Sequence, residues 1–231
     1  MKPQDLVPPH SRDDRRVCVH DRIWYVPMQF SQNTREPLFL FPGWDHPDFF
    51  GNNNPVNIEY CSGNGAWIAE RAVRYPHINW IAVERKFDRV RKLWSKVHNL
   101  KVSNLLVLCG EAYHATEKFF PTGTIDEVFI NFPDPWPKRR HTQNRLIQLP
   151  FLNQLGRVLK DNGKVTVVTD DEPHSQWLIG LMKENGNFAS TYPDPFYTTD
   201  CKTYGTSYFE DLWRSQGKTI YYHEFIRHGH P

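Results

Sequence analysis

The chain has 231 residues and a formal net charge of +2, so its overall charge does not indicate a nucleic-acid-binding protein. Hydrophobic residues make up 39% of it, which is enough for the core of one large domain. The mean hydropathy of -0.64 and the lack of an apolar run of roughly 18 residues exclude a membrane-spanning helix, and the N-terminus has no apolar signal segment.

Residues 1–50 carry prolines and charged runs, and we expect them to form a partly irregular N-terminal extension before a domain over residues 51–231. From Val56 onward, short β-branched segments alternate with amphipathic ones. The predicted strands are residues 56–61, 78–84, 105–109, 127–131, 163–170, 187–192 and 218–226. The predicted helices are residues 66–75, 88–100, 111–119, 142–159 and 175–186. Pro150 must kink or split the fourth of these helices.

This alternation predicts an α/β fold with an open, doubly wound and mostly parallel sheet. A closed eightfold barrel would need roughly 250 residues and more strand–helix units than the chain has. In open sheets of this kind, ligands bind beyond the carboxyl ends of the strands. The residues that follow each predicted strand are therefore the first candidates for a site.

Acidic residues occur inside or just after five of the predicted strands: Glu59, Glu84, Glu111, Asp134 and Asp170. A phosphate-binding cleft would instead present backbone N–H groups and cations at these positions. The acidic pattern favours a ligand that carries hydroxyl groups and positive charge.

A glycine turn, S-G-N-G, follows the first of these strands and allows the backbone to pass close to a ligand. We expect Gly63 and Gly65 to contact that ligand, although the G-x-G-x-x-G dinucleotide fingerprint is incomplete because Ile68 follows them. Glu84 ends the next strand and can accept both hydroxyl protons of an adenosine ribose. NAD and S-adenosylmethionine share that ribose, but the acidic cleft favours S-adenosylmethionine, which is cationic and has no pyrophosphate.

The segment F-P-D-P-W-P-K-R-R-H, residues 132–141, places one carboxylate, Asp134, among three prolines that restrict the backbone φ angles. A cluster of cations follows at Lys138, Arg139, Arg140, His141 and Arg145. This cluster would neutralise an RNA backbone beside the cleft. A second cluster over residues 85–96 lies on and before a predicted helix, where a solvated helix face is the simpler interpretation.

The same segment resembles the F-P-D-P-W-x-K-x-x-H signature of the bacterial tRNA (guanine-N7)-methyltransferases, which methylate guanine 46 of tRNA. Three later segments resemble further motifs of that family in the same order: T-D-D-E-P at 169–173, T-S-Y-F-E at 206–210 and G-K-T-I-Y-Y-H-E-F at 217–225. The likeness covers roughly residues 56–226. It implies a Rossmann-like class I methyltransferase fold, S-adenosylmethionine as cofactor and tRNA as partner.

The resemblance also implies roles for single residues. Asp134 is expected to be catalytic and to contact the cofactor. Further cofactor contacts are expected from Glu59, Glu84 and Glu111. Contacts with tRNA or guanine are expected from Lys138, Asp170, Ser207, Tyr208, Phe209 and Glu210. The sequence departs from the family pattern at Cys61, where a glycine is usual, at Glu111, where Asp is usual, and at Ser207, where Thr is usual.

The chemistry of guanine explains why such a loop is useful. N7 is an acceptor with a free lone pair and no proton, so its attack on a methyl group needs no general base. A fixed carboxylate at Asp134 favours the positive charge that reaches the purine ring, and it can accept hydrogen bonds from N1–H and the exocyclic amine. Phe132 or Trp136 could stack on a base or could pack in the core, and the sequence leaves both possibilities open.

Two alternatives remain open. An amino-group methyltransferase acting on adenine, cytosine or glutamine would use a related motif, which here would begin at Asn131. A non-catalytic tRNA-binding module with a vestigial cofactor pocket is the other, and Cys61 motivates it. The four cysteines are far apart and match neither a zinc site nor a disulfide framework, which favours a reducing cytoplasm. We expect no metal site, and no obligatory protein partner is evident.

Overall fold

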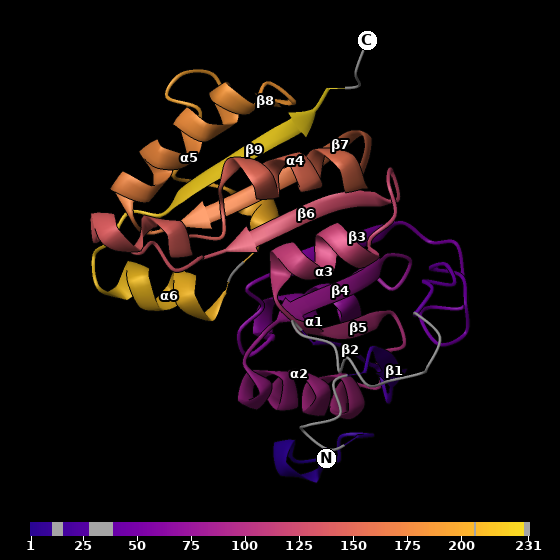
Figure 1. The fold of residues 1–231 in the computed structure, drawn as a ribbon. Helices are drawn as coiled ribbons and strands as arrows, with labels where there is room; N and C mark the ends of the chain where they lie inside the picture. Colours follow the sequence, from indigo (N-terminus) through magenta and orange to yellow (C-terminus); the bar gives the residue numbers. More distant parts are fainter. Residues whose placement is uncertain (11–15, 28–38, 206, 229–231) are drawn as a thin grey trace. The chain divides into compact units, whose positions relative to one another are not determined.

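A computed structural model of the chain describes residues 1–10, 16–27, 39–205 and 207–228, without the side chain of Arg139 (Figure 1). Residues 11–15 and 28–38 of the predicted extension and Thr206 of the T-S-Y-F-E segment lie outside this description. The chain forms two compact units, Met1–Phe120 and Pro121–Pro231, which we call the N-terminal unit and the C-terminal unit. Among the described residues, the structure has no helix with the length and apolar character needed to cross a bilayer.

The N-terminal unit has strands in the order β1-β2-β5-β4-β3. Strands β3 (Val56–Tyr60), β4 (Asn79–Glu84) and β5 (Leu105–Gly110) pair in parallel, as the sequence predicts. Helices α1 (Ala66–Arg74), α2 (Phe87–Leu100) and α3 (Ala112–Phe119) follow these strands in turn. The carboxyl ends of all three strands therefore meet at one edge of the sheet.

Helix α2 illustrates how the sequence pattern produces this packing. Val90, Leu93, Trp94 and Val97 recur at the spacing of one helical face, and all four are buried. This face covers β4 and β5, while the 3₁₀ turn η1 (Pro3–Asp5) packs on another side of the helix.

Strands β1 (Cys18–His20) and β2 (Ile23–Val26) lie in the segment that we predicted to be partly irregular, and the sequence analysis did not predict them. Strand β2 pairs in parallel with β5, and β1 forms an antiparallel edge. Trp24 explains why β2 joins this sheet: its indole is fully buried among aromatic rings, including those of Phe41, Phe49 and Phe120. Strands of three and four residues are too short to show a period. The boundary at residue 50 remains a prediction.

The C-terminal unit has strands in the order β6-β7-β9-β8. Strands β6 (Ile125–Asn131) and β7 (Leu159–Thr169) are parallel, whereas β9 (Tyr221–Arg227) runs antiparallel to β7 and to β8 (Phe188–Ser190). Helices α4 (Leu149–Val158) and α5 (Glu172–Asn185) pack side by side over this part of the sheet (Figure 1).

Proline and glycine set the ends of these helices. The segment predicted as one helix over 142–159 is split into the 3₁₀ turn η2 (Arg139–Asn144) and α4, and Pro150 lies in the first turn of α4, where its missing N–H is not needed. Helix α5 ends at Gly186, which has a φ of 72°, as expected of a terminal glycine. Helix α6 (Tyr208–Ser215) and the 3₁₀ turn η3 (Lys202–Tyr204) were not predicted.

Candidate functional site

The glycine turn of the N-terminal unit contacts the predicted ribose-binding carboxylate directly. The backbone N–H of Gly63 donates to Glu84 Oε2 at 3.1 Å. Gly65 has a φ of 72°, and a Cβ added to it would lie 2.0 Å from Leu93 Cδ2 on helix α2. No side chain fits at this position, so packing and backbone conformation together require glycine.

Glu84 is 5% exposed and ends strand β4. Its Oε1 accepts the backbone N–H of Lys86 at 2.8 Å, and Arg89 Nη1 lies 3.6 Å from its Oε2. An ionised carboxylate offers about four acceptor positions, so these contacts fix its orientation and still leave capacity for a diol. The remaining acceptor capacity of Glu84, beside the turn at Gly63 and Gly65, therefore fits the two hydroxyl groups of an adenosine ribose.

The other two predicted carboxylates of this unit, Glu59 and Glu111, lie in strand β3 and at the start of helix α3. Glu59 is buried in β3, in register with Ala82 of β4. Glu111 caps helix α3, where its two oxygens accept the N–H groups of Tyr113 at 3.1 Å and His114 at 2.7 Å. This cap gives Glu111 a structural role, and its contact with a cofactor stays a prediction.

Two cysteines lie next to these groups. Cys61 is exposed and has a φ of 61°, so the turn keeps the left-handed conformation although a cysteine replaces the usual glycine. Cys109 is the register partner of Glu84. Burial, and then the negative charge of Glu84, raise the pKa of the Cys109 thiol to about 12, so Glu84 has an uncharged neighbour at neutral pH.

In the C-terminal unit, strand directions gather the remaining candidates at one edge of the sheet. Strands β6 and β7 end there, and β9 begins there because it is antiparallel, with Tyr221 opposite Thr169. The loop after β6, Asp170 after β7 and helix α6 before β9 therefore share this edge. The ring of Phe132 lies 6.1 Å from that of Phe209 on α6, which joins two of the predicted segments.

The loop that carries Asp134 is held by its backbone and not by that side chain. Phe132 and Trp136 have φ angles of 48° and 42°, which are uncommon for residues with a side chain. Arg145 Nε donates to the carbonyl of Pro135 at 2.7 Å, and Arg145 Nη2 donates to that of Trp136 at 3.4 Å. Asp134 itself is exposed, and its carboxylate makes no hydrogen bond or ion pair within the described residues.

Arg145 has a different role from the one that its place in the basic cluster indicated. Its guanidinium stacks 4.9 Å from the ring centre of Trp177 on α5 while it donates to the loop carbonyls. Lys138 and Arg140 are exposed, and neither has a carboxylate partner in the described part of the chain. They remain candidates for contacts with a phosphate backbone, whereas the side chain of Arg139 lies outside the description.

The T-D-D-E-P segment forms the start of helix α5. Asp171 caps the helix by accepting the N–H of His174 at 2.7 Å, whereas Asp170 forms an ion pair with Lys218. His174 is buried below this edge, and burial lowers its pKa to about 4. The segment therefore has a clear structural role, and the contact of Asp170 with substrate stays a prediction.

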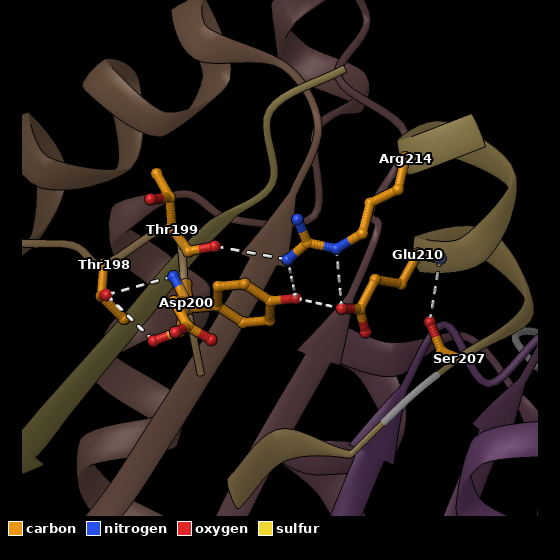
Figure 2. A network of polar contacts seen from close by, with 7 residues as sticks. Thr198, Thr199, Asp200, Ser207, Glu210 and Arg214 are labelled. Atoms are coloured by element: carbon orange, nitrogen blue, oxygen red, sulfur yellow. Dashed lines mark hydrogen bonds and ion pairs between the residues drawn. The ribbon is translucent and has the colours of Figure 1, made fainter. Parts of the chain in front are cut away.

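Helix α6 accounts for the last predicted segment (Figure 2). Ser207 Oγ accepts the backbone N–H of Glu210 at 3.1 Å. Glu210 is buried, and its Oε1 accepts from Arg214 Nε at 3.1 Å and from the hydroxyl of Tyr222 at 2.5 Å. Tyr208 and Phe209, in contrast, are 57% and 37% exposed. Ser207 and Glu210 thus hold the helix, while the two aromatic residues present their rings to solvent.

The sequence analysis missed Arg214, Tyr222 and Lys218, which hold Glu210 and Asp170. A signal for α6 was present, because S-x-x-E is a capping pattern and Glu210 and Arg214 are four residues apart. No comparable signal pointed to Tyr222 or Lys218. A search of the described residues finds no group of three His, Cys, Asp or Glu side chains that could hold a metal ion.

A family model described as "Putative methyltransferase" matches residues 53–223. The chain is 42% identical over 227 residues to a tRNA (guanine-N(7)-)-methyltransferase of Chlamydia caviae, and the match covers 98% of each chain. The chain belongs to the tRNA (guanine-N7)-methyltransferase family. A member from Staphylococcus aureus is 30% identical over 174 residues, which cover 75% of this chain and 81% of that one.

Family membership confirms the resemblance that the signature segment carries. The fold is confirmed as well: a crystal structure of a SAM-dependent methyltransferase from Aquifex aeolicus superposes with a TM-score of 0.53 and covers 76% of this chain and 85% of that one. Sequence identity in that superposition is 16%, so it bears on the fold alone. The roles of individual residues in this chain stay predictions.

Proposed function

We propose that this chain transfers a methyl group from S-adenosylmethionine to N7 of guanine 46 in tRNA. The observation that carries the proposal is the Asp134 loop, which is held by prolines and by Arg145 and presents an exposed carboxylate that has no partner in the described part of the chain. A carboxylate in such a position can bind a substrate without first breaking an existing contact. A cytoplasmic location, which the four free cysteines support, belongs to the same proposal.

The proposed cofactor site belongs to the N-terminal unit. Glu84 would accept the ribose hydroxyls, and the turn at Gly63 and Gly65 would lie against the cofactor, with Glu59 and Glu111 as further contacts. When bound, S-adenosylmethionine supplies the electrophilic methyl group. The contribution of these residues is to bind and orient, because Glu84 is already fixed by the N–H groups of Gly63 and Lys86.

The proposed substrate site belongs to the C-terminal unit. The Asp134 carboxylate would accept hydrogen bonds from N1–H and the exocyclic amine of guanine, which adenine cannot provide in the same pattern. It would also stabilise the positive charge that the purine gains when N7 is methylated. Tyr208 and Phe209 present exposed rings at the same edge, and Lys138 offers an unpaired cation to the RNA backbone.

The test is transfer of labelled methyl from S-adenosylmethionine to unmodified tRNA, followed by nucleoside analysis. We expect the label in 7-methylguanosine. Strand cleavage at 7-methylguanosine after borohydride and aniline treatment should map it to position 46, and a tRNA with adenine at that position should accept no label there. Label in methyladenine or methylcytosine would support the amino-group alternative, and S-adenosylmethionine binding without transfer would support the non-catalytic one.

A further inference from the structure

Exposed cations fall into two groups in this structure. Several lysines lie next to a carboxylate: Lys118 with Glu117 at 3.0 Å, Lys160 with Asp126 at 2.8 Å, and Lys164 with Glu224 at 3.3 Å. Helix α2 is different, because Arg89 lies 3.6 Å from Glu84 but most of the other cations on or beside the helix have no such partner in the part of the chain that the structure describes. Within the described residues, no carboxylate partner is present for Arg85, Lys86, Lys92, Lys96 or Lys101.

These cations lie on or directly beside helix α2. Arg85 and Lys86 precede the helix, Lys92 lies on its exposed side, Lys96 is one turn further along, and Lys101 caps its C-terminus. Residues 92 and 96 are neighbours on a helix because they are four positions apart. The opposite side of α2 is the buried face described above. The helix has 14 residues, so the cations extend over about 20 Å.

The N-terminal segment adds a further cation to this surface. The carbonyl of Met1 accepts hydrogen bonds from Ser95 Oγ at 2.7 Å and from Asn99 Nδ2 at 2.9 Å, so the segment is fixed on α2. The next residue, Lys2, is exposed, and its side chain has no carboxylate partner among the described residues. Sequence spacing gives no hint of this neighbour, because more than 90 residues separate it from α2.

Asp88 is the acidic residue within α2, and it lies in the first turn, where a carboxylate complements the helix dipole. Two further carboxylates beside α2 also have local contacts: Asp5 accepts the backbone N–H of Lys2 at 2.7 Å, and Asp21 Oδ1 lies 2.9 Å from His98 Nε2. Counting Lys2, six cations on or beside α2 have no carboxylate partner among the described residues. Repulsion among like charges is unfavourable, and ion pairs relieve it elsewhere in the molecule. A polyanion would relieve it here.

We propose that this surface, the α2 basic face (Lys2, Arg85, Lys86, Lys92, Lys96 and Lys101), binds the phosphate backbone of the tRNA substrate. The identity of the polyanion rests on the proposed function, because a tRNA methyltransferase must hold a large RNA. Lysine, which makes up most of this surface, contacts phosphates as a point charge, and phosphate contacts carry no base information, so the surface contributes affinity and no base recognition.

The test compares two double variants that remove the same charge. Lys92→Gln/Lys96→Gln changes the α2 basic face, and Lys118→Gln/Lys160→Gln removes two lysines that have carboxylate partners. Each lost phosphate contact lowers the slope of log Kd against log salt by about 0.7 to 0.9, so the first variant should lose about 1.5. Its tRNA affinity at 0.15 M salt should fall by about 10- to 30-fold. The control variant should keep the wild-type slope.

Cofactor affinity, measured by calorimetry, should stay at the wild-type value in both variants, because Glu84 and its bonded neighbours are untouched. A wild-type salt slope in Lys92→Gln/Lys96→Gln would overturn the proposal. An equal loss in the control variant would also overturn it, since net charge and not this face would then be responsible.

A second measurement needs no substitution. Lysine acetylation of the wild-type protein, read by mass spectrometry with and without tRNA, should show protection of Lys92 and Lys96 and unchanged reactivity of Lys118 and Lys160. If Lys92 and Lys96 are unprotected in a complex that forms 7-methylguanosine, RNA binding by the α2 basic face is refuted, but the proposed function is not. Protection in a protein that forms no 7-methylguanosine would instead refute the proposed function and leave the RNA surface standing.

Discussion

Two predicted site carboxylates, Glu84 in the N-terminal unit and Asp134 in the C-terminal unit, are held in opposite ways. In the N-terminal unit, Glu84 and Glu111 each use both oxygens to accept backbone N–H groups. In the C-terminal unit, Asp134 is exposed and makes no such contact within the described residues, while the backbone around it is fixed by Arg145.

This difference corresponds to two functions, cofactor binding and stabilisation of the charge that develops on the base. A carboxylate that binds a cofactor benefits from a fixed orientation, which backbone N–H groups provide at Glu84 and Glu111. A carboxylate that must respond to charge developing on a base has to be free of strong partners and still well placed. We therefore expect Glu84 to contribute to cofactor affinity and Asp134 to the rate of methyl transfer, and the following changes test that division.

The largest effect is expected at Asp134. Asp134→Asn should fold and bind both ligands, but its single-turnover methyl transfer should be about 10²- to 10³-fold slower, by analogy with the loss of a fixed electrostatic contact. The amide keeps the shape, removes the charge and turns one acceptor into a donor that faces the guanine N–H groups. Because N7 has no proton to lose, the residual rate should gain no new pH dependence between pH 6 and pH 9. Asp200→Asn, an exposed aspartate of the same unit, is the control, and near-normal rates in Asp134→Asn would refute its catalytic role.

Glu84→Ala should affect affinity instead of rate. Loss of hydrogen bonds to a charged group predicts S-adenosylmethionine binding weaker by about 1.5–3 kcal/mol, measured by calorimetry. Glu70→Ala removes an exposed glutamate from helix α1 and should leave that affinity unchanged. Equal cofactor affinity in the two variants would show that Glu84 only fixes the turn.

Arg145→Lys tests how the Asp134 loop is held. A lysine cannot donate to both loop carbonyls and stack on Trp177 at once, so methyl transfer should slow by about 10-fold through misplacement of Asp134. The salt slope of tRNA binding should not change, since the guanidinium is engaged by the protein. A lower slope with a normal rate would return Arg145 to the RNA-binding cluster.

Lys138→Ala tests the unpaired cation beside the same loop. Loss of one phosphate contact should lower the salt slope of tRNA binding by about 0.7 to 0.9, with cofactor affinity unchanged. The matched control is Lys164→Ala, because Lys164 has Glu224 as partner. If both variants keep the wild-type slope, the RNA backbone does not approach this loop.

The smallest effect concerns two buried groups, Cys109 and His174, which are both neutral because burial shifts their pKa values in opposite directions. Cys109 keeps its proton because its pKa is raised, whereas His174 stays without one because burial lowers its pKa to about 4 from an ordinary value of about 6.5. The unfolded chain therefore binds a proton at His174 before the folded chain does, and stability is lost as pH falls from 6.5 towards 4. Between pH 7.5 and pH 5.5 the contribution of His174 amounts to about 1 kcal/mol, which His174→Phe should remove in urea unfolding. His223, whose pKa burial also lowers to about 4, should keep its own contribution in that variant. An unchanged pH dependence in that variant would place the acid sensitivity elsewhere.

The sequence alone determined the alternating α/β order and the carboxyl-end positions of the candidate residues. Apolar periodicity is a local property, so helices such as α2 could be predicted almost to the residue. The signature F-P-D-P-W-x-K-x-x-H likewise carries its information in consecutive residues, and it was sufficient for the family and for the methylation chemistry.

The tertiary structure decided what the sequence pattern could not. Strands β1 and β2 exist because Trp24 is buried among rings from distant segments, and no local period marks them. The role of Arg145 depends on carbonyls nine and ten residues before it and on the ring of Trp177. The pairing of Asp170 with Lys218 spans 48 residues.

The same reason applies to the two basic clusters. The sequence analysis interpreted the cluster around Lys138 as an RNA contact and the cluster along α2 as a solvated helix face. Only the contacts showed that both contain cations without a carboxylate partner among the described residues. Ion pairing is a property of side chains that meet in space, often from remote parts of the chain. Sequence position therefore determines where charge is carried, and the fold determines which cations have no carboxylate partner in the described part of the chain.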